Sequence, residues 1–230
     1  MLEAIDLSKA YGAFYALKNL NLKVESGDIF CLMGQNGAGK TTTINLFLGF
    51  IRPTNGKALI NGIEVNAKGS TNQMIAYIPE VVQLYGNMNG LENLEFFSRL
   101  SGHRPTKAEL TSLLNKAGLQ EKDHQKKLAQ YSKGMRQKVG IAIALSKNAQ
   151  VIFMDEPTSG LDPQATDEFT SICKELAQEG KSIFMATHDI FNAVNVGTRI
   201  GIMKEGKLVS TRETSDINAH EMQELYLKTI

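Results

Sequence analysis

Residues 29–42 read Ile-Phe-Cys-Leu-Met-Gly-Gln-Asn-Gly-Ala-Gly-Lys-Thr-Thr, an apolar run followed by the pattern G-x-x-x-x-G-K-T. The run Ile29–Met33 predicts a strand buried on both faces, and spaced apolar residues over 44–51 predict a helix directly after the loop. Glycines let such a loop curl until several backbone N–H groups point at one anion, and the helix N-terminus adds partial positive charge. In this strand–loop–helix setting the pattern predicts a binding site for a nucleoside triphosphate.

The loop supplies most of the candidate phosphate-binding residues. Lys40 is long enough to reach the terminal phosphates, and the hydroxyl of Thr41 is an oxygen ligand suited to Mg²⁺. The surrounding residues complete the candidate set: Gly34, Asn36, Gly37, Ala38, Gly39 and Thr42. A glycine-rich turn that matches the pattern without binding phosphate is the alternative, and the predicted strand and helix on either side argue against it.

Two later segments have the same apolar character as the strand before the loop: Val151–Met154 and Ile183–Ala186. Short strands without polar positions are typical of parallel sheets covered by helices. A helical pattern follows each of them, and Asp162 and Pro163 suit the first residues of one such helix, which Gly180 ends. These segments predict an α/β fold with a mainly parallel sheet.

The N-terminal part of the chain contains a different kind of strand. Leu20, Leu22 and Val24 alternate with polar residues, which predicts a half-exposed strand. Asn61-Gly62 separates two short apolar segments and is a strong signal for a β-hairpin. We therefore expect an N-terminal antiparallel β subdomain beside the parallel sheet.

Strand patterns disappear between residues 85 and 145. Apolar residues at 91, 94, 97 and 100 predict one helix, and a capping box from Thr106 to Glu109 predicts the start of a second. We therefore expect a helical subdomain at 85–145, inserted into an α/β core formed by residues 1–84 and 146–230, all within a single domain spanning residues 1–230.

The composition excludes several classes of function. Lys and Arg number 25 against 24 Asp and Glu, so no basic excess points to nucleic acid, and no nucleic-acid partner is expected. Met1–Asp6 lacks a signal-peptide pattern and no apolar run approaches the ~20 residues of a membrane helix, which predicts a chain that is soluble by itself. Cys31 and Cys173 lie in apolar runs, which favours buried, inert thiols over a disulfide or redox pair.

Two carboxylates, Asp155 and Glu156, follow the apolar run that begins at Val151. Ligands of open α/β sheets lie beyond the carboxyl ends of the strands, so this acid pair is expected beside the phosphate loop if the two strands are neighbours. Asp155 is then the candidate partner of Mg²⁺ and its waters. Glu156, beside the bend at Pro157, is the candidate general base for water. A strand that simply ends in surface acids is the alternative.

Residues 131–137 read Tyr-Ser-Lys-Gly-Met-Arg-Gln and are similar to the signature L-S-G-G-Q of the nucleotide-binding subunits of ABC transporters. They lie after the predicted helical insert and before the acid pair, and an apolar helical segment at 139–145 follows them. The resemblance covers nearly the whole chain and implies a P-loop NTPase core. Residues 89–100, the signature variant and the tail at 222–227 resemble most the ATPases of ABC-2-type exporters.

Three more family elements appear in order along the chain. Tyr11, before a glycine, resembles the aromatic residue that stacks on adenine. A loop after the acid pair resembles the segment that communicates between the two sites of a dimer: Ser159, Gly160, Leu161 and Asp162. His188, between Thr187 and Asp189, resembles the switch histidine that reaches the γ-phosphate. Each element alone is weak evidence for the family. For Tyr11, the alternative is an ordinary aromatic residue of the core or of the surface. The order of the elements along the chain makes the resemblance specific.

The resemblance implies a motor subunit that binds and hydrolyses ATP with Mg²⁺. Lys40, Glu156 and His188 are then the catalytic residues. The signature residues act in trans on ATP held by the opposite subunit: Ser132, Lys133, Gly134 and Met135. The implied partners are a second ATPase subunit, expected as a homodimer around two ATP molecules, and a separate integral membrane permease. The implied location is the cytoplasmic face of the membrane, where the permease holds the chain.

The chain departs from the family at two places. Tyr77-Ile78-Pro79-Glu80 carries glutamate where the family usually has glutamine. Glu80 remains a candidate Mg²⁺ ligand through its oxygens, with Gln83 as the alternative if the register shifts. The signature opens with tyrosine and carries Lys133 and Met135 in place of glycine and glutamine, but its two contact residues, Ser132 and Gly134, are intact.

Other functions within the same family remain open from the sequence. A soluble ABC ATPase of iron–sulfur assembly or DNA repair is the alternative to a transporter subunit. DNA-repair members carry coiled-coil insertions and translation factors fuse two such domains, and the chain has neither feature. A module that binds ATP without hydrolysis is disfavoured, because Lys40, Asp155, Glu156 and His188 are all present.

Overall fold

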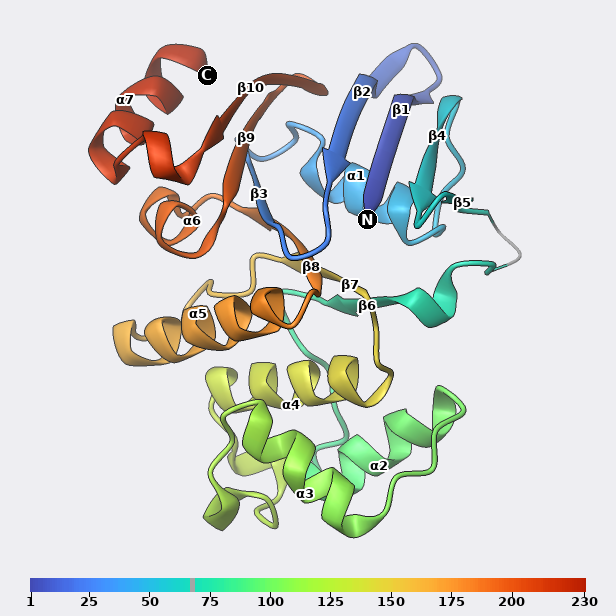
Figure 1. Cartoon of the computed structure of the whole chain (residues 1–230), viewed down its shortest axis with the longest axis vertical. Helices are drawn as coiled ribbons and strands as arrows, with labels where there is room; N and C mark the ends of the chain where they lie inside the picture. Colours follow the sequence, from blue (N-terminus) through green and yellow to red (C-terminus); the bar gives the residue numbers. More distant parts are fainter. Residues whose placement is uncertain (67–68) are drawn as a thin grey trace.

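The computed structural model describes residues 1–66 and 69–230, and its upper part holds two β-sheets (Figure 1). The larger sheet has six strands in the order β10-β9-β3-β8-β7-β6. These strands are β3 (Ile29–Met33), β6 (Ile75–Ile78), β7 (Val151–Asp155), β8 (Ser182–Thr187), β9 (Arg199–Lys204) and β10 (Lys207–Glu213). The pairing is parallel from β9 through to β6 and antiparallel between β9 and β10, so the prediction of a mainly parallel sheet is confirmed.

Burial on both faces explains why the central strands lack polar positions. Every residue of β3 and β8 is buried, and β7 is buried except at its last residue. Phe30 of β3 stacks on Phe184 of β8, with ring centroids 5.7 Å apart. Phe47, in helix α1 (Lys40–Phe47), stacks on Phe153 of β7 at 5.8 Å, so α1 crosses the sheet from β3 toward β7.

The second sheet is antiparallel, with strand order β2-β1-β4-β5. Its strands are β1 (Leu2–Tyr11), β2 (Phe14–Val24), β4 (Asn55–Ile60) and β5 (Ile63–Glu64). Asn61 and Gly62 form the turn between β4 and β5 with φ of 49° and 78°, the positive values that a two-residue hairpin turn requires. The predicted hairpin and N-terminal antiparallel sheet are therefore confirmed.

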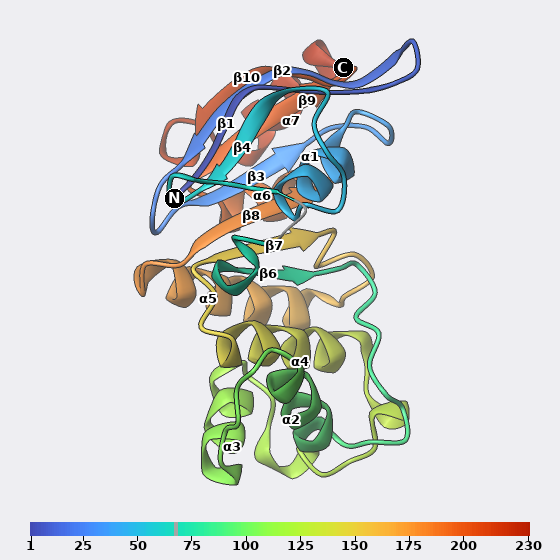
Figure 2. The ribbon, with the colours of Figure 1, turned by 90° about the vertical axis from the view of Figure 1, so that its right-hand side faces the viewer.

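Three helices lie together at the end of the molecule furthest from the antiparallel sheet (Figure 2). They are α2 (Gly90–Leu100), α3 (Lys107–Lys116) and α4 (Lys133–Ser146), with 3₁₀ turns at Glu121–Asp123 and Leu128–Gln130 between the last two. The predicted capping box starts α3: the N–H of Thr106 donates to the Glu109 carboxylate at 2.6 Å, and the N–H of Glu109 donates to Thr106 Oγ1 at 3.3 Å.

Helix α4 is longer than the sequence predicted. The apolar pattern predicted a helix over 139–145, whereas α4 begins at Lys133 and includes most of the signature. Ser132 causes the early start, because its Oγ accepts a hydrogen bond from the N–H of Met135 at 3.2 Å and caps the first turn. A cap residue sets a helix start even where the first turn has no apolar face.

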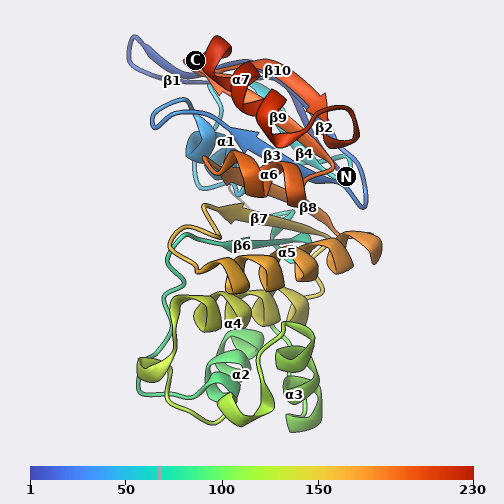
Figure 3. The same ribbon diagram turned by 90° about the vertical axis from the view of Figure 1, so that its left-hand side faces the viewer.

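The remaining helices belong to the C-terminal half. They are α5 (Pro163–Gln178), α6 (Ile190–Val196) and α7 (Ala219–Thr229). A 3₁₀ turn at Thr214–Asp216 precedes α7, and another at Asn72–Met74, much earlier in the chain, precedes β6. Figure 3 shows α6 and α7 next to each other beside β9. The start of α5 is as predicted, since the Asp162 carboxylate accepts from the N–H of Ala165 at 2.8 Å and Pro163 follows the cap. Within the described residues, no helix combines the length and the apolar character that crossing a membrane requires.

Both cysteines are expected to be inert in the folded protein. Cys31 and Cys173 are free and fully buried, and burial raises the pKa of the Cys31 thiol to about 12 and also raises that of Cys173. Because the thiolate is the reacting form, neither should react with Ellman's reagent at about pH 8 until the protein is unfolded, when both should react. Reaction of either thiol in the native protein, at a rate typical of an exposed cysteine, would contradict this packing.

Candidate nucleotide-binding site

Two glycines fix the shape of the loop between β3 and α1. Gly39, the residue before α1, has φ of 111°, and a Cβ there would lie 2.6 Å from the carbonyl oxygen of Ala16. A Cβ at Gly34 would lie 2.5 Å from the carbonyl oxygen of Met203. Only glycine therefore lets the loop approach both neighbouring segments. The turn delivers the chain directly into α1, whose first N–H groups have no intrahelical acceptors and remain available to an anion.

Lys40 is buried without a negatively charged partner. Its side chain is 7% exposed, and Nζ donates to the carbonyl oxygens of Gly34 at 2.6 Å and Gln35 at 3.3 Å. Across residues 1–66 and 69–230, none of the ion pairs involves Lys40. A buried cation with only neutral acceptors is incompletely compensated, and phosphate oxygens supply the charge it lacks. The loop and its lysine thus fit the phosphates of a nucleotide.

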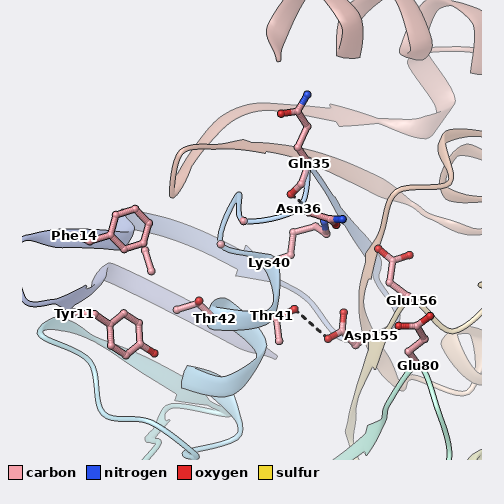
Figure 4. A pocket seen from close by; sticks show the side chains of 13 residues that line it. Tyr11, Phe14, Gln35, Asn36, Lys40, Thr41, Thr42, Glu80, Asp155 and Glu156 are labelled. Atoms are coloured by element: carbon pink, nitrogen blue, oxygen red, sulfur yellow. Dashed lines mark hydrogen bonds between the residues drawn. The ribbon is translucent and has the colours of Figure 1, made fainter.

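The loop opens into a pocket of about 440 Å³ (Figure 4). Tyr11 and Phe14 lie at one end of this pocket, Glu80, Asp155 and Glu156 lie at the other, and the phosphate loop lies between them. The full lining is Tyr11, Phe14, Ala16, Gln35, Asn36, Gly37, Gly39, Lys40, Thr41, Thr42, Glu80, Asp155 and Glu156. An aromatic end and an acidic end on either side of a phosphate loop match the base, the phosphates and the metal of a metal–nucleotide complex.

Most of the candidate ATP-binding, metal-binding and catalytic residues from the sequence line this pocket, whereas Gly34, Ala38 and His188 do not. Three lining residues were absent from the sequence prediction: Phe14, Ala16 and Gln35. Phe14 is the cross-strand partner of Tyr11, and both rings are more than half exposed, at 64% and 53%. The sequence contains a signal that would have identified Phe14. Two aromatic residues flank a two-residue turn, and this spacing places both side chains at the same end of a hairpin.

Thr41 and Asp155 meet at the acidic end, by a route that the sequence did not predict. The sequence placed the acid pair beside the loop on the condition that the two preceding strands are neighbours, and this condition is not met, because β8 lies between β3 and β7. Helix α1 closes the gap by crossing the sheet, and Thr41 Oγ1 donates to Asp155 Oδ2 at 3.2 Å. The contact therefore depends on the helix rather than on strand adjacency.

The acidic end offers oxygen ligands in a partly buried setting. Burial raises the pKa of Asp155, the nearby carboxylates of Glu156 and Glu80 add to this rise, and the hydrogen bond from Thr41 opposes it. Hydroxyl and carboxylate oxygens are the ligands that Mg²⁺ prefers. Within the described part of the chain, no group of three or more His, Cys, Asp or Glu is arranged to hold a metal ion.

Glu80 rather than Gln83 occupies the acidic end. Glu80 lines the pocket, whereas Gln83 is exposed and does not. Strand β6 pairs with β7, so the segment after β6 runs beside Asp155 and Glu156. The register that the sequence left open is thus resolved geometrically in favour of Glu80.

Glu156 and His188 meet at the carboxyl edge of the parallel sheet. β7 and β8 are neighbours, and the residues that follow them come together there. His188 Nδ1 lies 2.8 Å from Glu156 Oε2, and the main-chain N–H of His188 donates to the same oxygen at 3.3 Å. Glu156 has φ of 45°, a left-handed conformation that costs a non-glycine residue on the order of 1–3 kcal/mol and is found mainly at functional sites. His188 does not line the pocket and touches it through Glu156.

The signature residues lie outside this pocket, at the start of α4. None of the four is a lining residue: Ser132, Lys133, Gly134 and Met135. The predicted communication loop lies closer, because Ser159 Oγ donates to Glu80 Oε1 at 3.1 Å. Gly160 and Leu161 then lead to Asp162, the cap of α5. Within one chain, the pocket therefore lacks the signature that the family resemblance assigns to it.

The chain belongs to the ABC transporter family, because the family model described as "ABC transporter" matches residues 17–159, more than half of the sequence. It is similar to the lantibiotic transport ATP-binding protein SrtF of Streptococcus pyogenes, with 31% identity over 98% of this chain and 96% of that protein. It is also 33% identical to the uncharacterized ABC transporter ATP-binding protein sll0415 of Synechocystis sp., over 94% of this chain, and spans only 64% of that longer relative.

Solved structures agree with this assignment. The dimeric structure of a post-hydrolysis state of the ATP-binding cassette MJ0796, bound to ADP and Pi, superposes with a TM-score of 0.82 at 28% identity, covering 93% of this chain and 99% of that one. The predicted α/β fold with its P-loop core is therefore confirmed as the fold of an ABC ATPase.

Asp155 is expected to lower the stability of the nucleotide-free protein. The pKa of Asp155 is raised in the folded protein, so folding disfavours the ionised carboxylate that dominates at neutral pH. This loss of folding free energy disappears at acidic pH, where the carboxyl group is protonated. Asp155→Asn should therefore raise the melting temperature by a few degrees at about pH 7.

The difference between Asp155→Asn and the wild type should shrink as the pH falls toward the pKa of Asp155, measured by thermal unfolding between about pH 4 and 8. Asp167→Asn, on the exposed face of α5, is the matched control and should change little. A lower melting temperature for Asp155→Asn at neutral pH would contradict this account of Asp155.

Proposed function

We propose that the chain is the ATP-hydrolysing motor subunit of a membrane exporter. The observation that carries this proposal is Lys40, a buried ammonium group whose partners are carbonyl oxygens, in a loop with space for an anion above it. SrtF, which the chain matches over nearly its full length, is named a lantibiotic transport ATP-binding protein, and this favours a transporter subunit over a soluble ATPase of iron–sulfur assembly or DNA repair.

The pocket accommodates ATP in one orientation. Tyr11 and Phe14 present ring faces suited to adenine, and base stacking on an aromatic side chain contributes roughly 1–3 kcal/mol. Lys40 and the N-terminus of α1 then hold the β- and γ-phosphates. At the opposite end, the oxygens of Thr41, Asp155 and Glu80 are placed to hold Mg²⁺. When bound, Mg²⁺ neutralises charge on the phosphate oxygens.

Glu156 is the group best placed to accept a proton from water. Its carboxylate lines the pocket, and His188 contacts only one of its two oxygens, Oε2, which leaves Oε1 for the water that attacks the γ-phosphate. A proton on Nδ1 lets His188 donate to Glu156 and hold the carboxylate in that orientation. Lys40 stabilises the charge that develops on the transferred group.

A second subunit completes the site. The signature residues 132–135 do not line the pocket of their own chain, so they are free to contact ATP on a partner, as the family resemblance implies. Ser132 offers a hydroxyl and Gly134 a closely approaching N–H to an oxyanion. The MJ0796 cassette, which has the same fold, is dimeric with ADP and Pi bound. We therefore propose a dimer around two ATP molecules, with the loop 159–162 communicating between its sites.

The helical part of the chain presents a surface for a membrane permease. Tyr85 is exposed and stands edge to face with Phe96, with ring centroids 5.0 Å apart, and Phe97 packs beside both rings. Val81 and Leu100 are also exposed nearby in sequence. Exposed aromatic clusters of this kind mark protein interfaces. We propose that residues 85–145 form a helical subdomain of one ABC ATPase domain and that this surface docks the permease at the cytoplasmic face of the membrane.

Glu156→Gln is expected to separate binding of ATP from its hydrolysis. The amide keeps the shape of the side chain but cannot accept a proton, so hydrolysis should fall by about 10²–10⁴-fold while ATP still binds. With ATP and Mg²⁺ the variant should elute as a dimer in size-exclusion chromatography with light scattering. A Glu156→Gln protein that stays monomeric in ATP would contradict the proposed homodimer.

Lys40→Ala provides the complementary case. Loss of a hydrogen-bonded charge partner of phosphate costs about 2–5 kcal/mol, so ATP binding should weaken by about 100-fold, measured by isothermal titration calorimetry. Gln178→Ala, exposed at the end of α5, serves as the control and should bind normally. Normal ATP affinity in Lys40→Ala would contradict the assignment of the loop.

Changes at the docking surface should uncouple the chain from its permease. Tyr85→Asp or Leu100→Asp places a charge in the exposed apolar surface, so an integral membrane protein that copurifies with the tagged wild-type chain from detergent-solubilised membranes should be lost. ATP hydrolysis by the isolated subunit should be unchanged, since neither residue lines the nucleotide pocket. Val209→Asp, at an exposed apolar residue of β10, is the matched control, and its equal loss of the membrane protein would show that the effect is not specific to this surface.

A further inference from the structure

Residues 79–85, the first part of the connection from β6 to α2, are fastened to the helices at several points. Figure 2 shows this connection running beside α4 on its way from the sheet to α2. We refer to these residues as the strap. Its first part places Glu80 in the nucleotide pocket, and its last residue, Tyr85, belongs to the exposed aromatic cluster. One short segment therefore links the pocket to the proposed docking surface.

Gln137 holds the first part of the strap. Its side chain comes from α4 and is 1% exposed. Nε2 donates to the carbonyl oxygen of Glu80 at 3.2 Å and lies 3.5 Å from that of Pro79. Because both neighbours are acceptors, only the amino half of the amide suits this position, which fixes the orientation of the side chain.

The amide oxygen of Gln137, Oε1, indicates that this side chain has a role beyond the packing of α4. Oε1 is buried and has no hydrogen-bond partner among the described residues. A buried acceptor without a partner destabilises the folded state and calls for a reason. The contact of the amino half with the strap supplies such a reason, because an apolar residue of similar size would fill the same space without the cost.

Two further contacts hold the rest of the strap. Val82 is buried against α4 at Gly140, where an added Cβ would lie 3.3 Å from Val82 Cγ2, so glycine permits the close approach. Asn93 of α2 is fully buried, and its side chain accepts from the N–H of Tyr85 at 2.8 Å and donates to the carbonyl oxygen of Tyr85 at 3.1 Å. The backbone of the strap is thus tied to α4 and α2.

The Glu80 carboxylate is held from the same side. Lys133, one turn before Gln137 on α4, places Nζ 4.0 Å from Glu80 Oε1, and Ser159 Oγ donates to that oxygen at 3.1 Å. Gln137 therefore holds the backbone of Glu80 while Lys133 and Ser159 contact its side chain. The signature helix contributes two of these three contacts.

We infer that Gln137 is a positioning residue that fixes Glu80 on the signature helix and so sets the place of the Glu80 carboxylate in the nucleotide pocket. Lys133 offsets the negative charge that Glu80 brings near the phosphates. We call the contact of Gln137 with the backbone of the strap the clamp, and it rests only on contacts within the chain. Its effect on a bound nucleotide rests on the proposed function.

The clamp is tested in the nucleotide-free protein by hydrogen exchange of the strap. Gln137→Met keeps the volume of the side chain and removes the donor, and Gln137→Glu keeps its shape and replaces the donor with an acceptor. In both variants the backbone amide of Tyr85, which donates to Asn93, should exchange about tenfold faster, while the amides of α3 stay unchanged. Gln178→Met on α5 is the matched control. Unchanged exchange of the strap in both variants would overturn the clamp.

The consequence for Glu80 is tested by a double-mutant cycle on ATP affinity, measured by calorimetry with and without Mg²⁺. In the wild-type background Gln137→Met should reduce the gain in ATP affinity from Mg²⁺ by about threefold, and in a Glu80→Ala background it should have no further effect. An equal loss in both backgrounds would show that Gln137 does not act through Glu80 and would overturn the inference. If the wild-type chain binds no ATP, the proposed function fails and the role at the nucleotide fails with it, while the exchange experiment separately decides the clamp.

Discussion

The buried ammonium group of Lys40 is the constraint on which the site depends. It sits where the chain curls from β3 into α1, and its partners within the chain are carbonyl oxygens. Such a charge remains incompletely compensated until an anion arrives, and the same curl leaves the first N–H groups of α1 available to that anion. The folded chain therefore carries a cost that binding of a phosphate group would relieve.

The parallel sheet brings residues that are far apart in the sequence together at one of its edges. β6, β7 and β8 end side by side, so Glu80, Glu156 and His188 gather although more than a hundred residues separate the first from the last. This gathering costs stability, since burial raises the pKa of Asp155 and Glu156 adopts a left-handed backbone. Both costs lie at the place where an ABC ATPase needs a metal ligand and a base.

Helices α2, α3 and α4 carry the surfaces that we propose for partner subunits. The signature begins α4 outside the pocket of its own chain, and the aromatic cluster around Tyr85 is exposed. The contacts of Gln137 and Lys133 with the Glu80 segment connect these two surfaces to the pocket. Through these contacts, the proposed clamp relates the position of α4 to that of Glu80 in the pocket.

The amino-acid sequence alone determined the α/β class, the antiparallel N-terminal part, the phosphate loop and the family, because these features depend on local patterns: hydrophobic period, turn residues and motif spacing. Only the tertiary structure decided that β8 separates β3 from β7, that α1 carries Thr41 across to Asp155, that Glu80 rather than Gln83 enters the pocket, and that Phe14 joins Tyr11. Strand order and helix crossing arise from packing between segments far apart in the chain, and no local pattern contains that information.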